Sequence, residues 1–127
     1  MGETPVAQWL RFAERDLEEA RLLQEHDFYR DKIGFCLQQT VEKLLKALIA
    51  KVPRLHDLVV LVEETGRLID TKEFKALFFK LNKYYIAPRY PAPVPFEPSR
   101  EEIDLLFDET ERFSQTVHDI VKSVSPE

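Results

Sequence analysis

Hydrophobic residues recur in the first part of the chain at the spacing of a buried helix face. Thr4 and Pro5 suit a helix cap and the first helical position, so a helix is predicted from there to about Gln24. Its apolar stripe repeats at alternating intervals of four and three residues, and consists of Val6, Leu10, Ala13, Leu17 and Ala20.

A second and wider stripe predicts the most buried helix of the protein. Asp31 can cap this helix, and Pro53 marks its end. The central stripe consists of Leu37, Val41, Leu44 and Leu48, and Phe35, Leu45 and Ile49 widen it. A short helix is predicted over residues 57–64, with Gly66 as its left-handed stop.

Two capping boxes predict the remaining helices. Residues 70–73 can open a helix whose inner face consists of Phe74, Leu77, Phe78 and Leu81. The five prolines between positions 88 and 98 exclude a helix there and predict an extended connector. Residues 99–102 can open the last helix, whose inner stripe consists of Ile103, Leu106, Thr110, Phe113, Val117, Ile120 and Val124.

These patterns predict one all-α domain over residues 1–127, built as an up-down bundle of four to five helices. No segment has the two-residue alternation of a strand, and only three glycines occur. Since the second and last helices carry long apolar stripes, we expect them to pack against each other in antiparallel fashion.

Composition limits the classes of protein that fit. The sole cysteine, Cys36, excludes an intrachain disulfide and zinc sites built from several cysteines, and its apolar neighbours favour a buried residue over a nucleophile. The longest apolar run, residues 58–62, is too short to span a bilayer. Since the N-terminus also lacks the layout of a secretory signal, a cytoplasmic location is expected.

The net charge of −5 is unevenly distributed. Residues 32–100 hold 12 basic and 7 acidic groups, whereas both flanking segments are acidic. A basic middle can present a phosphate-binding surface, or it can complement the charge of neighbouring helices. Familiar phosphate-loop, zinc-protease and serine-hydrolase motifs are missing, and no glutamate precedes a histidine by three positions. We therefore predict neither a metal nor a cofactor.

Three groups of side chains are candidates for ligand binding. Gln39, Lys43 and Lys46 follow one another at intervals of four and three, so they share one helix face and can present an amide and two cations to a phosphate or a base. The alternative is a solvated polar face. Arg54 and His56 come directly after Pro53, where a histidine beside Asp57 can act as an acid or a base, or can simply pack beside a helix cap.

The third group combines tyrosines with an arginine around the start of the connector. It consists of Tyr84, Tyr85, Arg89 and Tyr90. Aromatic rings beside cations suit single-stranded nucleic acid or a nucleotide base. Alternatively, the tyrosines hold the connector against the bundle while Arg89 bridges to an acidic helix.

Several of these segments, in this order, resemble the HEPN family of small helical proteins. Residues 35–48, which read FCLQQTVEKLLKAL, resemble the family's paired glutamines followed by Glu-Lys and Lys-Ala-Leu. His56-Asp57-Leu58 resembles its His-Asp-Leu signature, and residues 85–91 resemble its Tyr…Arg-Tyr-Pro ending. The first helix also fits, through Trp9, Ala13, Asp16, Leu17 and Ala20.

The resemblance implies a helical bundle, a homodimer, and a toxin–antitoxin-like pairing with a small nucleotidyltransferase. It also implies a ribonuclease motif in which an arginine and a polar residue precede a histidine. The nearest fit is Arg112 and His118, but Phe113 replaces the polar residue. Six positions on one continuous helix separate these side chains by about 120°, so a second subunit would have to complete the site. Arg21 and His26 fit the spacing as well.

Three functions remain open at this point. The first is a metal-independent module that binds nucleotide or RNA and acts with a nucleotidyltransferase. The second is an endoribonuclease toxin in which His118 is the acid or base and Arg112 stabilises the charge of the phosphate. The third is a non-catalytic interaction module that dimerises through an apolar helix face.

Overall fold

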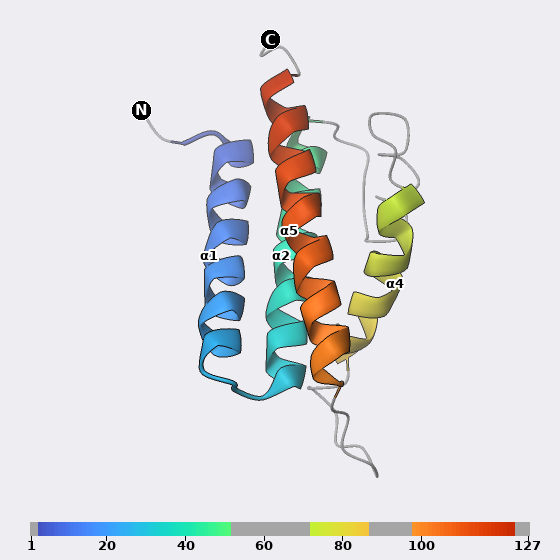
Figure 1. Cartoon of the computed structure of the whole chain (residues 1–127). Helices are drawn as coiled ribbons and strands as arrows, with labels where there is room; N and C mark the ends of the chain where they lie inside the picture. The colour runs from blue at the N-terminus through green and yellow to red at the C-terminus, as the bar shows by residue number, and fades with distance from the viewer. Residues whose placement is uncertain (1–2, 52–71, 87–97, 124–127) are drawn as a thin grey trace.

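Four α-helices make up the parts of the chain that the structure describes. The computed structural model describes residues 3–51, 72–86 and 98–123 of the 127 residues. The helices are α1 (Pro5–Glu25), α2 (Arg30–Lys51), α4 (Lys72–Ile86) and α5 (Arg100–Ser123), arranged as an all-α bundle (Figure 1). The predicted helix over residues 57–64, its stop at Gly66 and most of the proline-rich connector lie outside the described residues.

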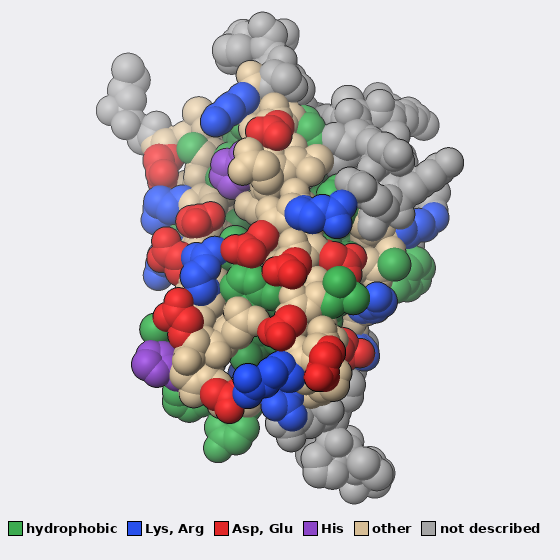
Figure 2. Space-filling model, viewed as in Figure 1, with side chains coloured by type: hydrophobic (Ala, Val, Ile, Leu, Met, Phe, Trp, Pro, Cys, Tyr) green, Lys and Arg blue, Asp and Glu red, His purple; other side chains and the backbone are tan. Residues whose placement is uncertain are grey.

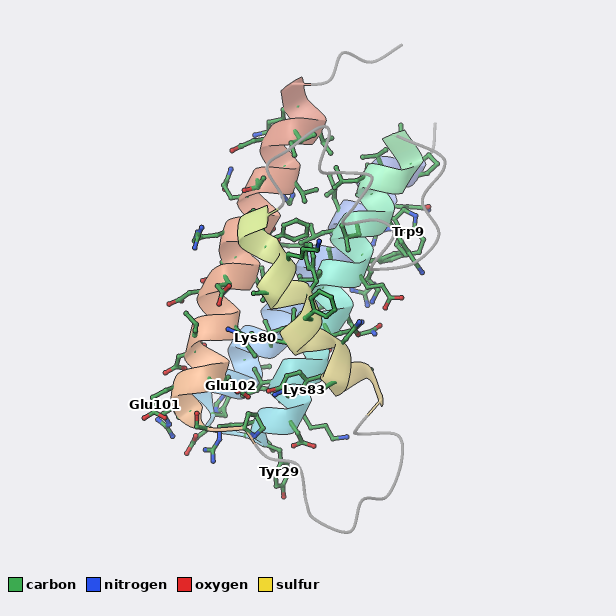
Figure 3. The ribbon with its side chains drawn as sticks, turned by 90° about the vertical axis from the view of Figure 1, so that its right-hand side faces the viewer. Trp9, Tyr29, Lys80, Lys83, Glu101 and Glu102 are labelled. Carbon is green, nitrogen blue, oxygen red and sulfur yellow. The ribbon has the colours of Figure 1, made fainter. Side chains whose placement is uncertain are left out.

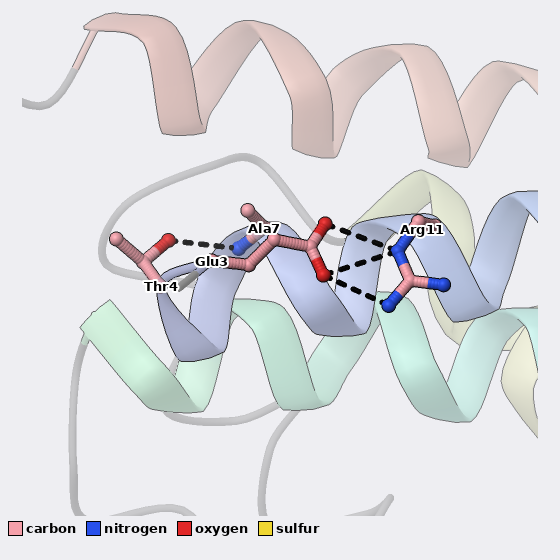
Figure 4. Close-up of polar contacts among 4 residues, drawn as sticks. All are labelled: Glu3, Thr4, Ala7 and Arg11. Atoms are coloured by element: carbon pink, nitrogen blue, oxygen red, sulfur yellow. Dashed lines mark hydrogen bonds and ion pairs between the residues drawn. The ribbon is translucent and has the colours of Figure 1, made fainter. Parts of the chain in front are cut away.

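Local side-chain contacts begin α1 where the sequence predicts. The Thr4 hydroxyl accepts a hydrogen bond from the amide of Ala7 at 3.1 Å, which satisfies one of the free N–H groups of the first turn (Figure 4). Glu3, which precedes the helix, pairs with Arg11 at 2.8 Å (Figure 4). The prediction of Thr4 as the cap is therefore confirmed.

The start of α2 differs from the prediction by two residues, because a cap at Asp31 would begin the helix at residue 32. The helix begins at Arg30, and Asp31 lies inside its first turn, not at the cap. The carbonyl of Tyr29 accepts hydrogen bonds from the amides of Lys32 and Ile33. The backbone before Asp31 therefore already makes helical hydrogen bonds. A carboxylate in the first turn still interacts favourably with the helix dipole.

The predicted antiparallel packing of α2 and α5 is wrong, because these helices run in the same direction. Arg30 of α2 donates to the carbonyl of Pro98 at 2.7 Å, and Arg100 of α5 pairs with Asp27 at 2.6 Å, so both helices start at one end of the bundle. In Figure 1, α4 runs back to that end before α5 begins. Each described helix is therefore antiparallel to the next described one, and α2 and α5 are parallel.

The inner faces of the four helices form one hydrophobic core. It contains most of the predicted stripe positions within the described residues, including Ala13, Leu17, Leu37, Val41, Leu44, Phe74, Leu81, Phe113 and Val117. Thr110 is buried in this core as well, and its hydroxyl donates a hydrogen bond to the carbonyl of Leu106 at 2.7 Å. That bond removes most of the cost of burying a hydroxyl.

Aromatic side chains attach α4 to the helices beside it. The rings of Phe74 and Phe78 lie edge-on to Phe113 of α5, with centroids 5.1 and 5.0 Å apart. Near the other end of α4, the hydroxyl of the fully buried Tyr84 donates a hydrogen bond to the carboxylate of Glu102 of α5 at 2.9 Å. The hydroxyl of Ser99 accepts a hydrogen bond from the amide of Glu102 at 3.1 Å, which confirms the predicted cap of α5. The carboxylate of Glu102, however, is bonded to the tyrosine.

Candidate functional site

Three predicted ligand residues of α2 lie together on its outward edge, beside α1. Lys43 forms an ion pair with Asp16 of α1. The ammonium of Lys46 lies 4.9 Å from the centroid of the Trp9 ring. Gln39 donates to Gln38 at 2.7 Å and to Glu42 at 3.3 Å. Their helical spacing therefore places an amide and two cations on one surface, as predicted, although each already has a partner within the chain.

We call this region the α1–α2 surface, and define it by Trp9 and Asp16 of α1 and by Gln39, Lys43 and Lys46 of α2. Figure 3 shows Trp9 on the side of the bundle away from α5. The two helices are antiparallel neighbours, so the Trp9–Lys46 and Asp16–Lys43 contacts follow one another along the edge where they pack. The surface thus combines a half-buried cation and an aromatic ring with an ion pair.

A groove of about 390 Å³ continues this surface toward the start of α2. Its polar lining consists of Asp16, Glu19, Lys32 and Gln39, and its apolar lining of Leu23, Phe35 and Cys36. Burial, together with the nearby carboxylates of Glu19 and Asp16, raises the pKa of the Cys36 thiol to about 12. The thiol therefore stays protonated near neutral pH, which is consistent with the prediction that Cys36 is buried and is not a nucleophile.

A second group of aromatic and cationic side chains lies beside Trp9 and was not among the predicted site residues. The rings of Trp9 and Phe12 meet edge-on with centroids 6.2 Å apart. The guanidinium groups of Arg11 and Arg15 lie 4.9 and 5.9 Å from the centroid of the Phe12 ring. Phe12 lies outside the apolar stripe while following Trp9 by three positions, and this spacing is the signal that could have identified the group.

Tyr84 is a core residue, and the prediction that its ring contacts a ligand is wrong. Its side chain is fully buried against α2 and α5, so its ring has no face left for stacking. Burial, followed by the hydrogen bond to Glu102, raises the pKa of its hydroxyl above the ordinary value. The side chain of Tyr85 is not described, and Arg54, His56, Arg89 and Tyr90 lie outside the described residues.

Arg112 and His118 point in different directions from one continuous helix. The guanidinium of Arg112 lies 5.7 Å from the ring centroid of Phe74, toward α4. The Nδ1 atom of His118 lies 2.8 Å from the carbonyl oxygen of Ser114, one turn back along α5. Because α5 is unbroken between them, the two side chains do not meet within one subunit.

The described part of the chain contains no group of three or more histidine, cysteine, aspartate or glutamate side chains that could hold a metal ion. Among the described helices, none has the length and apolar character needed to span a membrane.

Comparison with known proteins identifies the family. No curated protein and no solved structure matches the chain. A family model described as the HEPN domain matches residues 6–120, which include all of α2 and α4 and most of α1 and α5. The chain therefore belongs to the HEPN family.

Proposed function

We propose that this protein is a HEPN module that binds single-stranded RNA or a nucleotide on the α1–α2 surface. The observation that carries the proposal is the contact of Lys46 with Trp9, next to Lys43 and Gln39. Single-stranded nucleic acids bind where cations neutralise phosphates and aromatic rings stack on bases. Membership of a family generally linked to RNA supports the same conclusion.

Neighbouring side chains support a binding path longer than one nucleotide. Phe12, with Arg11 and Arg15 over its ring, adds a second pairing of an aromatic ring with cations next to Trp9. The groove lined by Gln39 and Phe35 adds an amide and a further ring at the other end of the surface. Arg54, His56, Tyr85, Arg89 and Tyr90 remain predicted ligand residues and are part of the proposal.

The ion pair between Lys43 and Asp16 reduces what Lys43 can contribute to binding a phosphate. A phosphate that binds Lys43 has to compete with the carboxylate, so this cation contributes less than a free lysine would. Lys46 has no carboxylate partner among the described residues that would compete in this way, and we assign it the larger share of the binding energy.

A small nucleotidyltransferase is the partner that we propose, in a cytoplasmic toxin–antitoxin-like pair, with the protein itself as a homodimer. The HEPN family assignment supports these proposals. A neighbouring reading frame that encodes a nucleotidyltransferase would support the pairing, and failure of the two purified proteins to associate would contradict it.

Binding is tested with a fluorescent single-stranded RNA, with an unlabelled nucleotide as competitor, at several salt concentrations. We expect Lys46→Ala to weaken binding by several-fold and to lower the salt slope by about 0.7 for the lost phosphate contact. Lys43→Ala should have a smaller effect. Lys80→Ala, on an exposed position of α4, is the matched control and should leave binding unchanged. The proposal is refuted if Lys46→Ala and Arg89→Ala bind as the wild type does, or if the wild type shows no salt-sensitive binding.

An endoribonuclease is the second candidate, and the orientation of His118 favours it. When the Nδ1–H group of His118 donates a hydrogen bond to the carbonyl of Ser114, the other ring nitrogen is left to exchange protons with a substrate. Arg112 would stabilise the phosphate charge, and a second subunit would bring it close enough. Incubating RNA with the wild type and with His118→Ala tests this, because equal cleavage by both proteins excludes the role of His118.

A non-catalytic module that only dimerises is the third candidate. It predicts a dimer that binds no RNA and cleaves none, which the same two assays detect.

A further inference from the structure

Two adjacent helices of the bundle present outward rows of opposite charge. On α4, Lys75, Phe79 and Lys83 follow one another at intervals of four, and all three are exposed. On α5, Glu101, Leu105 and Glu109 have the same spacing, and lie at exposed or half-buried positions. Each row thus has one large apolar residue between two like charges. We call these the α4 row and the α5 row.

The apolar residue at the centre of each row is exposed. Phe79 is 61% exposed and Leu105 is 51% exposed, although neighbours in the sequence such as Phe78 and Leu106 are buried. Exposed large apolar side chains inside a charged rim are typical of protein contact sites. In Figure 2, acidic side chains predominate over α5, and basic and hydrophobic side chains lie along the edge formed by α4.

The two rows lie side by side and at about the same height. Tyr84 near the end of α4 contacts Glu102 near the start of α5, and Phe74 near the start of α4 contacts Phe113 farther along α5. The helices are therefore antiparallel, and Phe79, midway between those contacts, lies within about one helical turn of the level of Leu105. Lys83 already lies 3.6 Å from Glu102, yet 43% of its side chain is exposed (Figure 3).

We propose that the α4 and α5 rows together form the surface through which two copies of this chain associate. A two-fold axis that lies in the interface and runs along the helices exchanges the two rows across it, so α4 of one copy lies antiparallel to α5 of the other. The α4 row then faces the α5 row of the second copy with the two chain directions opposed. Phe79 meets Leu105, while Lys75 meets Glu109 and Lys83 meets Glu101, and the symmetry repeats all three contacts.

Charge decides between this arrangement and its alternatives. Two α5 rows in contact would oppose glutamates, and two α4 rows would oppose lysines, so both arrangements are repulsive. Crossed pairing brings opposite charges together at equal spacing, about 6 Å along each helix at 1.5 Å per residue. This inference rests on the homodimer of the proposed function, and assigns its surface.

The test compares apolar and charge-reversed variants by sedimentation velocity and native mass spectrometry. The wild type is expected to be a dimer at micromolar concentration. Phe79→Ser and Leu105→Ser are expected to raise the dimer dissociation constant by at least about tenfold, as for residues at the centre of an interface. Leu22→Ser is the matched control, because Leu22 is 55% exposed on α1 and lies outside the two rows. It should leave the dissociation constant unchanged.

Charge reversal gives the sharper result. A variant with Lys75→Glu and Lys83→Glu, and one with Glu101→Lys and Glu109→Lys, should each be monomeric, since every crossed contact becomes repulsive. Mixed together they should form a one-to-one heterodimer, because both sets of crossed contacts are then attractive. Helical circular dichroism checks that each variant is folded.

Several outcomes overturn the assignment. A monomeric wild type contradicts the homodimer itself. A dimeric wild type whose apolar variants also remain dimeric places the interface elsewhere and leaves the homodimer standing, as does the lack of a heterodimer from two folded charge variants. RNA binding is measured on Phe79→Ser in parallel, so that loss of the dimer and loss of the proposed binding function are distinguished.

Discussion

Replacing Gly34 with alanine tests how α4 packs on α2. A Cβ atom at this position would lie 2.3 Å from Cδ1, 2.4 Å from Cε1 and 2.8 Å from Cγ of the Tyr84 ring. Tyr84 is fully buried and its hydroxyl is bonded to Glu102, so the ring cannot simply turn into solvent. The substitution has to displace the ring or push α4 away from α2.

Two opposing effects determine the sign of the change. Alanine is favoured over glycine inside a helix by about 1 kcal/mol. Forcing extra volume into a packed core costs about 1–3 kcal/mol, and losing the bond of Tyr84 to a charged carboxylate costs about 1.5–3 kcal/mol more. Because these three short distances all involve a buried ring, the unfavourable effects dominate. We expect Gly34→Ala to lower the free energy of unfolding by about 2 kcal/mol or more.

Urea denaturation monitored by circular dichroism measures this change, and a second background isolates its cause. In a Tyr84→Ala variant the clash no longer exists, so Gly34→Ala should be neutral or stabilising there by up to about 1 kcal/mol. If Gly34→Ala stabilises the wild type, or destabilises both backgrounds equally, the close approach of Gly34 to Tyr84 does not control the packing.

The remaining predictions concern the α1–α2 surface and the buried thiol. Asp16→Asn should lower the free energy of unfolding by about 1 kcal/mol, because a half-buried ion pair is lost. The same change should strengthen RNA binding, because Lys43 loses its competing carboxylate. Urea denaturation should therefore show a less stable protein while RNA titration shows a higher affinity. Trp9→Ala should weaken RNA binding by about 1–3 kcal/mol, and Trp9→Phe should restore part of it. Cys36 should make the protein less stable in alkali, since its raised folded pKa stabilises the fold below the unfolded value of about 8.5 and this contribution is lost as pH rises toward 12. Urea titrations should show a lower free energy of unfolding at about pH 10 than at about pH 8. The difference between the two pH values should be smaller in Cys36→Ala.

Most of the bundle could be predicted from the sequence because its signals are local. The cap at Thr4 and the stripe through Leu17 define α1, and Ser99 defines the start of α5. The relative direction of α2 and α5 could not be obtained in this way. It depends on how many helices lie between them, and an apolar stripe buries equally well against a parallel or an antiparallel neighbour.

The candidate site was predictable only where spacing along one helix determines it. Gln39, Lys43 and Lys46 share a face by their spacing alone, and the structure places them together. Their partners Asp16 and Trp9 come from another helix, so the contacts depend on packing that no local pattern records. Tyr84 was misassigned for a related reason, because the same pattern of tyrosines and cations suits a ligand surface and a core edge.

The partners of Lys43 and Lys46 also bear on the RNA binding that we propose for this acidic protein. With a net charge of −5, the molecule as a whole repels phosphates, and binding has to come from a local surface. At that surface Asp16 neutralises one lysine, whereas Trp9 holds the other without removing its charge. A ligand that offers only phosphates therefore competes with a carboxylate and gains little, while one that also stacks a base on the aromatic ring gains at both positions. Single-stranded RNA should consequently bind more tightly than a duplex of equal length, whose bases cannot reach Trp9, and equal affinities would show that stacking has no part in recognition.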